Sequence, residues 1–304
     1  MSYYIHDDIK RIFSTQSDHV AEGLSIYALA DAAQDKFFLS KWMHLPQRNL
    51  LTEAAGEKAA QISPHLIQLN SEMTSLEWIH IQKRVISTPK MTLIVSPLNF
   101  EEMYVHLRQF TNVRFDGGLE MFLAFWDPII LATLLGHQAD ETLYIQEQVL
   151  DKEQKQILLG PIHTWWYWDR LGQLQQITGL NLQSFQQSFD SQNPLCFSVD
   201  QEEKMVEATF PDHLIYYLKL NNYFLVENFT AWDLYQYVIS ALKHARSFHL
   251  QGTRDILNFI CLKLGYQEHF EIDQQLQKVL LKVKEKQITM DQAMEMLEDS
   301  SPAL

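Results

Sequence analysis

One apolar segment constrains the fold of this chain more than any other, because its pattern changes from strand-like to helix-like at an Asp–Pro pair. Residues 122–126 read Phe-Leu-Ala-Phe-Trp, an apolar and aromatic run typical of a buried strand. Asp127 and Pro128 follow, and the next residues form a short helix-like run that ends at Gly136. Pro suits the first position of a helix, and Gly suits the position just after its end. The segment therefore predicts a strand that turns directly into a helix, with Asp127 at the junction.

Other strands are predicted from short apolar runs. The runs at 25–30 and 91–95 each read as a buried strand, and the first ends at Asp31. The turn residues 116–118, Asp-Gly-Gly, separate two apolar runs, so residues 113–126 are predicted to form a hairpin. A further strand is expected to begin at 157–159 and to continue through Gly160 and Pro161 into the aromatic run 164–168.

Helix signals alternate with these strands. A helix is expected after the first strand, through Trp42. Ser63 and Pro64 are residue types of a helix start, so residues 63–69 are predicted to be helical. Asn99 and Glu102 have the spacing of a capping box, which predicts a helix that starts there.

The second half of the chain differs from the first in composition and in the spacing of its apolar residues. Residues 171–194 are rich in Gln and Ser, and we expect residues 190–194 (Asp-Ser-Gln-Asn-Pro) to form a loop or linker. Beyond them apolar residues recur at helical spacing, as at 232–242, 256–264 and 272–283, and Thr289 and Gln292 form a last capping box. We therefore predict an α/β fold. A mixed-sheet N-terminal lobe with flanking helices spans 1–195, and an all-helical C-terminal lobe spans 196–304.

Composition excludes several classes of partner. Of the 304 residues 46% are apolar, so a large core can form, and the net charge is −14. Nucleic acids and anionic membranes are bound through basic surfaces, so neither is expected as a partner. No apolar run approaches the ~20 residues of a membrane helix, and no secretory signal is visible at the N-terminus, so we expect a cytoplasmic location.

The sequence offers little catalytic chemistry. It contains no phosphate-binding loop, no dinucleotide fingerprint, no nucleophile elbow and no common zinc spacing. We expect no cofactor, no metal site and no catalytic residues, so the chain is not predicted to be an enzyme.

Two carboxylates are nevertheless candidates for acid–base chemistry. Asp31 and Asp127 each follow an apolar strand, where α/β folds often place functional residues, and a pair of carboxylates could act as general acid and base. Asp127 also precedes Pro128 and a helical run, so its side chain can accept bonds from the first amides of that helix, which is the favoured interpretation. For Asp31 a cap and a buried structural partner are equally open.

An aromatic cluster has two interpretations. Residues 165–168 read Trp-Trp-Tyr-Trp, and in a strand alternate residues face opposite sides. Trp165, Trp166 and Trp168 could therefore present an open face to a protein partner, since Trp is enriched in binding hot spots. The alternative, slightly favoured, is a large aromatic plug in the core between the two lobes.

Several motifs together resemble a known bacterial family. Five segments occur in the order found in type VI secretion adaptor chaperones. They are residues 27–33 (Tyr-Ala-Leu-Ala-Asp-Ala-Ala), 63–69 (Ser-Pro-His-Leu-Ile-Gln-Leu), Ser96 with residues 98–108, 125–128 (Phe-Trp-Asp-Pro) and 159–165. The structural motif of that family falls here on Asp31, Ser96, Asp127, Pro128, Gly160 and Pro161.

The resemblance implies a function without catalysis. Such adaptors hold the N-terminal segment of a toxic effector in the cytoplasm and help to load it onto the C-terminal region of the VgrG spike. Two other hypotheses stay open: a hydrolase that uses Asp31 and Asp127, and an immunity-type protein that blocks the catalytic domain of a toxin.

Overall fold

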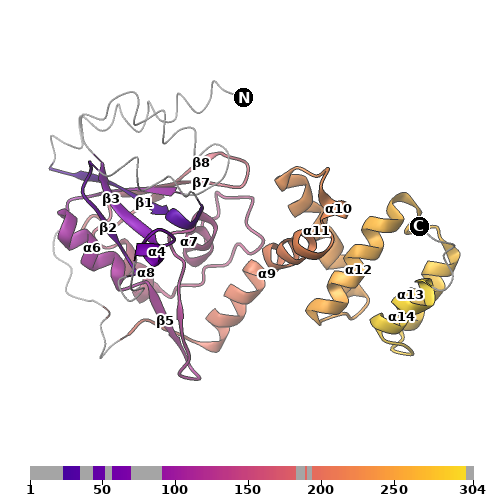
Figure 1. The fold of residues 1–304 in the computed structure, drawn as a ribbon. Helices are drawn as coiled ribbons and strands as arrows, with labels where there is room; N and C mark the ends of the chain where they lie inside the picture. The colour runs from indigo at the N-terminus through magenta and orange to yellow at the C-terminus, as the bar shows by residue number, and fades with distance from the viewer. Residues whose placement is uncertain are drawn as a thin grey trace. The chain divides into compact units, whose positions relative to one another are not determined.

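The computed structural model describes residues 23–34, 44–51, 57–69, 91–182, 189 and 194–298. The chain forms two compact units, Met1–Val206 and Glu207–Leu304, and the division lies within helix α9 (Val199–Asn221). The N-terminal unit contains the sheets with helices on them, and the C-terminal unit is helical, which confirms the predicted fold class (Figure 1). The sequence places the boundary at 195–196, and the independence of the two parts stays a prediction.

The N-terminal unit is built on a six-stranded sheet with the order β2-β3-β1-β4-β7-β8. Every neighbouring pair in it is antiparallel. The strands at 25–30 and 91–95 are confirmed as β1 and β4. The bounds are β1 Ser25–Asp31, β2 Gln47–Asn49, β3 Pro64–Leu69, β4 Met91–Ser96, β7 Thr164–Trp168 and β8 Leu174–Thr178.

The central strands of this sheet are buried on both faces. In β7, Trp165 and Tyr167 belong to one hydrophobic core, whereas Trp166 and Trp168 belong to another on the opposite face. Successive side chains of a strand alternate between faces, so a strand covered on both sides must be apolar throughout. This explains why β1, β4 and β7 read as continuous apolar runs.

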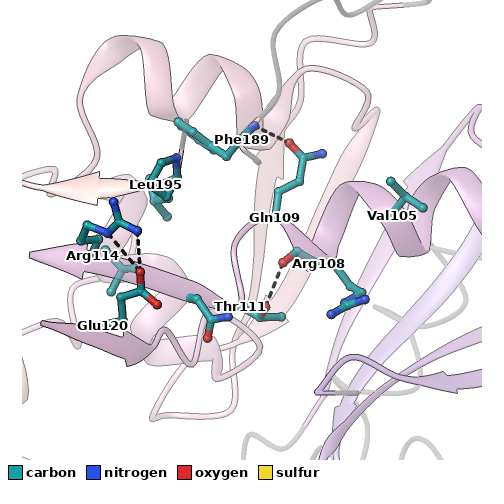
Figure 2. Close-up of a pocket in the computed structure, with 11 residues that line it drawn as sticks. Val105, Arg108, Gln109, Thr111, Arg114, Glu120, Phe189 and Leu195 are labelled. Atoms are coloured by element: carbon teal, nitrogen blue, oxygen red, sulfur yellow. Dashed lines mark hydrogen bonds and ion pairs between the residues drawn. The ribbon is translucent and has the colours of Figure 1, made fainter. Parts of the chain in front are cut away.

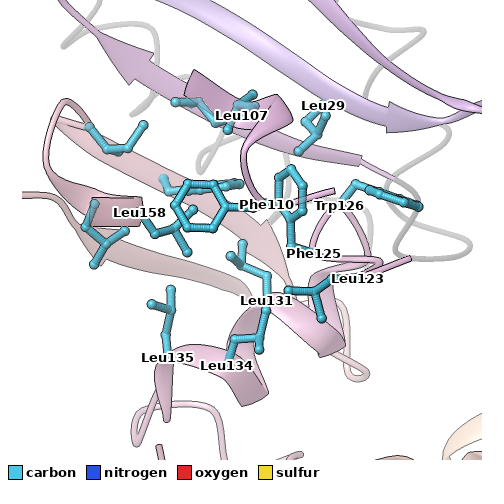
Figure 3. Close-up of a cluster of buried hydrophobic side chains, with 14 of the residues drawn as sticks. Leu29, Leu107, Phe110, Leu123, Phe125, Trp126, Leu131, Leu134, Leu135 and Leu158 are labelled. Carbon is cyan, nitrogen blue, oxygen red and sulfur yellow. The ribbon is translucent and has the colours of Figure 1, made fainter. Parts of the chain in front are cut away.

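Three helices contribute to the larger of the two cores. Leu107 of α6, Leu131 of α7 and Leu158 of α8 lie in one cluster with Leu29 of β1 (Figure 3). The Asn99–Glu102 capping box is confirmed at the start of α6, and a second box of Asp151 and Gln154 starts α8. The bounds are α6 Phe100–Arg108, α7 Pro128–Leu135 and α8 Lys152–Leu159.

A smaller sheet of three strands has the order β6-β5-β9. Strands β5 (Asn112–Phe115) and β6 (Glu120–Phe122) form the hairpin predicted from residues 116–118, and β9 (Cys196–Phe197) pairs in parallel with β5. Strand β6 ends at Phe122, so Phe125 and Trp126 lie in the turn before α7 rather than in the strand.

Two predictions from local sequence were wrong. Residues 64–69 form a strand, β3, because β1 and β2 pair with it on either side; Pro is tolerated at its first position. Residues 157–159 end helix α8, which the Asp151 capping box starts. Within the segment rich in Gln and Ser, Leu174–Thr178 forms strand β8 beside β7. Most of the loop expected at 190–194 falls outside the described residues. The helix expected through Trp42 falls mostly outside the described residues.

The C-terminal unit confirms the predicted helices and the capping box of Thr289 and Gln292. Gly265 lies inside α12, and Ile272, at the start of the predicted 272–283 helix, precedes α13. No helix in the described part of the chain is long and apolar enough to cross a membrane. The bounds are α10 Tyr223–Val226, α11 Ala231–Ser247, α12 Thr253–Tyr266, α13 Gln274–Lys284 and α14 Met290–Glu298.

A buried histidine joins two of the helices in the N-terminal unit. The ring of His106 in α6 is buried, and its Nε2 lies 3.0 Å from the carbonyl oxygen of Leu158 in α8. Burial lowers the pKa of His106 to about 4, so the imidazole is neutral near pH 7 and its Nε2–H donates to that carbonyl.

The neutral state of His106 makes stability depend on pH. An unfolded chain protonates its histidine near pH 6.5, so the unfolded state gains the proton first as the pH falls. The contribution is complete above pH ~6.5 and is lost as the pH falls toward the folded pKa. Between about pH 7.5 and pH 5 we expect the wild type to lose about 2 kcal/mol more unfolding free energy than His106→Gln.

Urea unfolding followed by tryptophan fluorescence measures this difference, because Trp165, Trp166 and Trp168 lie in the same unit. Gln at position 106 keeps an N–H donor for the Leu158 carbonyl without titrating. Equal pH dependence in the two proteins would contradict the assignment.

Candidate functional site

The Asp–Pro junction is a helix cap. A side-chain oxygen of Asp127 accepts the backbone N–H of Ile129 at 2.8 Å and that of Ile130 at 3.3 Å. Pro128 is the first residue of α7, where a missing N–H costs nothing. At the other end of α7, Gly136 has φ 58°, and a Cβ there would lie 2.6 Å from the backbone of Gln148. The polar residue at this junction therefore serves the local fold.

Three of the motif segments meet around one buried hydroxyl. Ser96, at the end of β4, donates its Oγ–H to the carbonyl of Pro161 at 2.7 Å and accepts the backbone N–H of Leu98 at 3.2 Å. The hydroxyl of Tyr27 in β1 donates to the carbonyl of Leu98 at 2.6 Å. Gly160 stands just before Pro161 and caps α8. The contacts join β1, β4 and the segment that leads into β7.

Asp31 also acts close to its own position in the chain. Its Oδ1 accepts the backbone N–H of Ala33 at 2.9 Å, at the start of a short 3-10 turn, Ala32–Gln34. In α/β folds the carboxyl ends of parallel strands meet at one edge of the sheet, where functional residues gather. Here β1 is antiparallel to both neighbours, so their carboxyl ends lie at the opposite edge.

The tryptophan cluster lies inside the N-terminal unit. Trp165, Trp166 and Trp168 are 0%, 5% and 1% exposed, so none of them presents an open ring. Trp165 also donates its indole N–H to the hydroxyl of Thr92 at 2.8 Å. The interpretation in which one face of this strand is open to a partner is therefore corrected, because apolar residues cover both faces of β7. The slightly favoured interpretation, burial in a core, is confirmed within the N-terminal unit.

Sequence reasoning missed a buried polar group around Asp140. Its Oδ1 accepts from the backbone and the hydroxyl of Thr142, at 2.9 and 2.6 Å, and its Oδ2 accepts from the hydroxyl of Tyr167 at 3.0 Å. Burial, followed by the nearby Asp140 carboxylate, raises the pKa of Tyr167 above its ordinary range. Burial also raises the pKa of Asp169, although the amide of Gln175 donates to this carboxylate at 2.8 Å. No local pattern identifies Asp140, because Tyr167 lies in a distant strand.

A pocket of about 390 Å³ lies where α6 ends beside β5. The residues that line it include Arg108, Gln109, Arg114, Glu120, Phe189 and Leu195 (Figure 2). Arg114 donates from Nε and Nη2 to one oxygen of Glu120, at 3.0 and 2.7 Å. The backbone N–H of Phe189 donates to the side-chain oxygen of Gln109 at 2.8 Å.

Two exposed apolar surfaces stand out, one in each unit. The first, the hairpin surface, consists of Leu119, Met121 and Phe122. The second, the α9–α10 surface, consists of Tyr216, Leu220, Tyr223 and Phe224. Exposed apolar clusters of this kind mark sites of protein association more often than isolated apolar residues do.

The α9–α10 surface follows one side of a helix and continues into the next. Tyr216 and Leu220 are four residues apart and share a face of α9, and Phe224 of α10 is 69% exposed. A pocket of about 490 Å³ lies between α9 and α12, with His213, Tyr217 and Leu257 in its lining. The rings of His213 and Tyr217 in this lining are in contact, with their centroids 4.8 Å apart and their planes tilted by 47°. Among the described residues no group of His, Cys, Asp and Glu could hold a metal ion.

The cap assignment gives a direct test. Asp127→Ala removes the acceptor for the amides of Ile129 and Ile130, so we expect the free energy of unfolding to fall by about 1 kcal/mol. Asp127→Ser retains a capping oxygen and should recover most of that loss. Urea denaturation of the three proteins measures both effects. A loss as large in the Ser variant as in the Ala variant would mean that the carboxylate acts there in another way.

Comparison with known proteins finds one family model that matches part of the N-terminal unit. Residues 26–143 match a family described as a domain of unknown function, DUF4123. The matched segment contains Asp31, Ser96 and the Asp127–Pro128 junction. No curated protein matches the chain, and no solved structure matches it. Residues 26–143 are thus similar to the DUF4123 family, and the match ends before the helical C-terminal unit.

Proposed function

We propose that this protein is an adaptor chaperone of type VI secretion, which holds an effector in the cytoplasm and helps to load it onto the VgrG spike. The match of residues 26–143 to DUF4123 is the observation that carries the proposal, since that family is associated with type VI effector adaptors. The proposed partners are the N-terminal segment of the effector and the C-terminal region of the spike.

The contacts of the motif residues support a structural role for the N-terminal unit, as a scaffold for binding surfaces. Asp127 caps α7, and Ser96 joins the segment around Pro161 to β4. These residues hold the N-terminal unit together and leave its outer surfaces free to differ between proteins that share the fold. An adaptor needs this division, because effectors differ from one another while the secretion apparatus stays the same.

The α9–α10 surface is the proposed site for the effector. Its four residues expose aromatic and aliphatic side chains, which supply most of the binding energy in many protein interfaces. The neighbouring pocket, lined by His213, Tyr217 and Leu257, offers a recess for an apolar anchor from the partner. We assign the effector to this unit because variable cargo is best read by a part of the chain outside the family match.

The two other hypotheses are less well supported. A hydrolase would use Asp31 and Asp127 together, but each carboxylate accepts backbone N–H groups at the start of a helical turn. An immunity-type protein would bind the catalytic domain of a toxin and not its N-terminal segment. Effector fragments that carry only one of these parts therefore separate an adaptor from an immunity protein.

Co-purification tests the proposal. The full chain should form a stable complex with the effector encoded by a neighbouring gene, and with that effector's N-terminal segment alone. The double variant L220D/F224D places charges on the α9–α10 surface, so we expect about tenfold weaker binding or more, measured by calorimetry.

Leu281→Asp provides the matched control, since Leu281 is also exposed but lies on α13. It should bind as the wild type does. Absence of a complex with either the effector or the spike protein would refute the adaptor function, and equal binding by L220D/F224D would refute the assignment of the surface.

A further inference from the structure

The smaller sheet has an edge strand, β6, with no strand paired on its outer side among the described residues. Strand β6 stands at the end of the order β6-β5-β9, and among the described residues β5 is its only neighbour. An edge strand carries a row of backbone donors and acceptors that can pair with another chain. What this edge can bind depends on which of its groups point outward.

The register of the hairpin identifies those groups. The N–H of Leu123 donates to the carbonyl of Thr111, and the N–H of Phe115 donates to the carbonyl of Leu119, both at 2.9 Å. In an antiparallel pair, hydrogen-bonded and non-hydrogen-bonded positions alternate. The positions between, where Glu120 faces Arg114 and Phe122 faces Asn112, are therefore non-hydrogen-bonded. The N–H and C=O groups of Glu120 and Phe122 point away from β5.

A contact on the other side of β5 agrees with this alternation. The N–H of Arg114, the partner of Glu120, points away from β6 and donates to the carbonyl of Leu195 at 2.9 Å. The equivalent outward groups of β6 therefore form a short, open ladder at Glu120 and Phe122.

The side chains along this edge lack the usual protection against pairing. Natural edge strands commonly carry Lys, Pro or a bulge that discourages a second strand. Here Leu119, Met121 and Phe122 are 62%, 52% and 59% exposed, and Glu120 is the one charged residue of the strand. An exposed apolar edge of this kind favours association with an extended polypeptide.

The carboxylate of Glu120 selects the charge of the partner. Both bonds from Arg114 end on Oε1, so Oε2 has no hydrogen bond or ion pair within the described part of the chain. Glu120 and Phe122 are two residues apart and share one face of the strand (Figure 2 shows Glu120 beside Arg114). A complementary strand therefore carries a basic residue opposite Glu120 and an apolar residue opposite Phe122.

We propose that β6 binds an extended strand of a partner protein by strand addition, with alternate basic and apolar residues on the strand's contacting face. This deepens the proposed function and rests on it for the identity of the partner. A second copy of this chain fits poorly, because pairing two β6 edges brings two Glu120 side chains into one short ladder and each chain carries a net charge of −14.

A synthetic peptide tests the edge without a natural partner. The acetylated and amidated peptide TIKVIVT places Lys and Ile two residues apart on one face, and it is titrated into the full chain by NMR. We expect saturable binding at or below about 1 mM, and about fivefold weaker binding when Glu replaces Lys. No binding by the wild type at that concentration would overturn the proposal.

Two comparisons identify backbone pairing as the cause. Phe122→Ala removes the exposed ring, whereas Phe122→Pro also removes the outward N–H, so Pro should weaken binding about tenfold relative to Ala. Because the Pro variant could disturb the hairpin, the peptide is also N-methylated at alternate amides. Methylation of the amides that face β6 should abolish binding, and methylation of the amides that point away from β6 should leave it intact. Equal effects of the two sets would refute strand addition.

The natural complex distinguishes this inference from the adaptor function. If wild-type chain binds effector or spike but F122P binds both equally well, the adaptor function stands and the role of β6 fails. If neither protein binds while the peptide does, the adaptor function fails and the strand-accepting edge stands. Self-association of the free chain that is lost in F122P would assign the edge to a second copy instead.

Discussion

Burial of the central strands on both faces is the constraint on which the N-terminal unit depends. In β1, β4 and β7 alternate side chains enter two different cores, so nearly every position must be apolar. Such strands have no face left for a partner or a substrate. At strand ends, Ser96 and Asp31 satisfy backbone groups. Within the strands, polar groups such as the Thr92 hydroxyl are paired inside the core. Binding chemistry has to be placed on the hairpin and on the helices.

The arrangement separates what holds the fold from what can recognise a partner. Asp127 caps its own helix, whereas Ser96 and Pro161 join two segments of the N-terminal unit, and a change at any of them acts on stability first. The hairpin surface and the α9–α10 surface contribute little to either core. Their residues can therefore vary with the partner without a large cost in stability, as an adaptor of the proposed kind requires.

The two surfaces offer different recognition chemistry. The α9–α10 surface presents side chains of Tyr216, Leu220 and Phe224 whose own backbone groups are used within helices, so it selects by shape and apolar area. Strand β6 presents backbone groups and one carboxylate, so it selects an extended chain with a suitable alternation. A protein that carries both can recognise a folded helical element and a strand of different partners, or two parts of one partner.

Local signals in the sequence determined the elements whose cause is local. These elements all involve residues within one turn or two of each other. They are the capping box of Asn99 and Glu102, the Asp127–Pro128 junction, the turn at 116–118 and the helical periodicity of the C-terminal unit. The match of pattern to structure there follows from short-range hydrogen bonding and from the 3.6-residue period.

Contacts between distant segments decided the rest. Ser63 and Pro64 have the residue types of a helix start, yet pairing with β1 and β2 makes the segment that follows a strand. The sequence only slightly favours a core over an interface for the tryptophans of β7, and the two hydrophobic clusters on opposite faces of the sheet bury them. The link between Asp140 and Tyr167, and the open ladder of β6, depend on which strands become neighbours. Sequence fixes local preference, whereas strand pairing and burial are cooperative properties of the whole unit, and they override it.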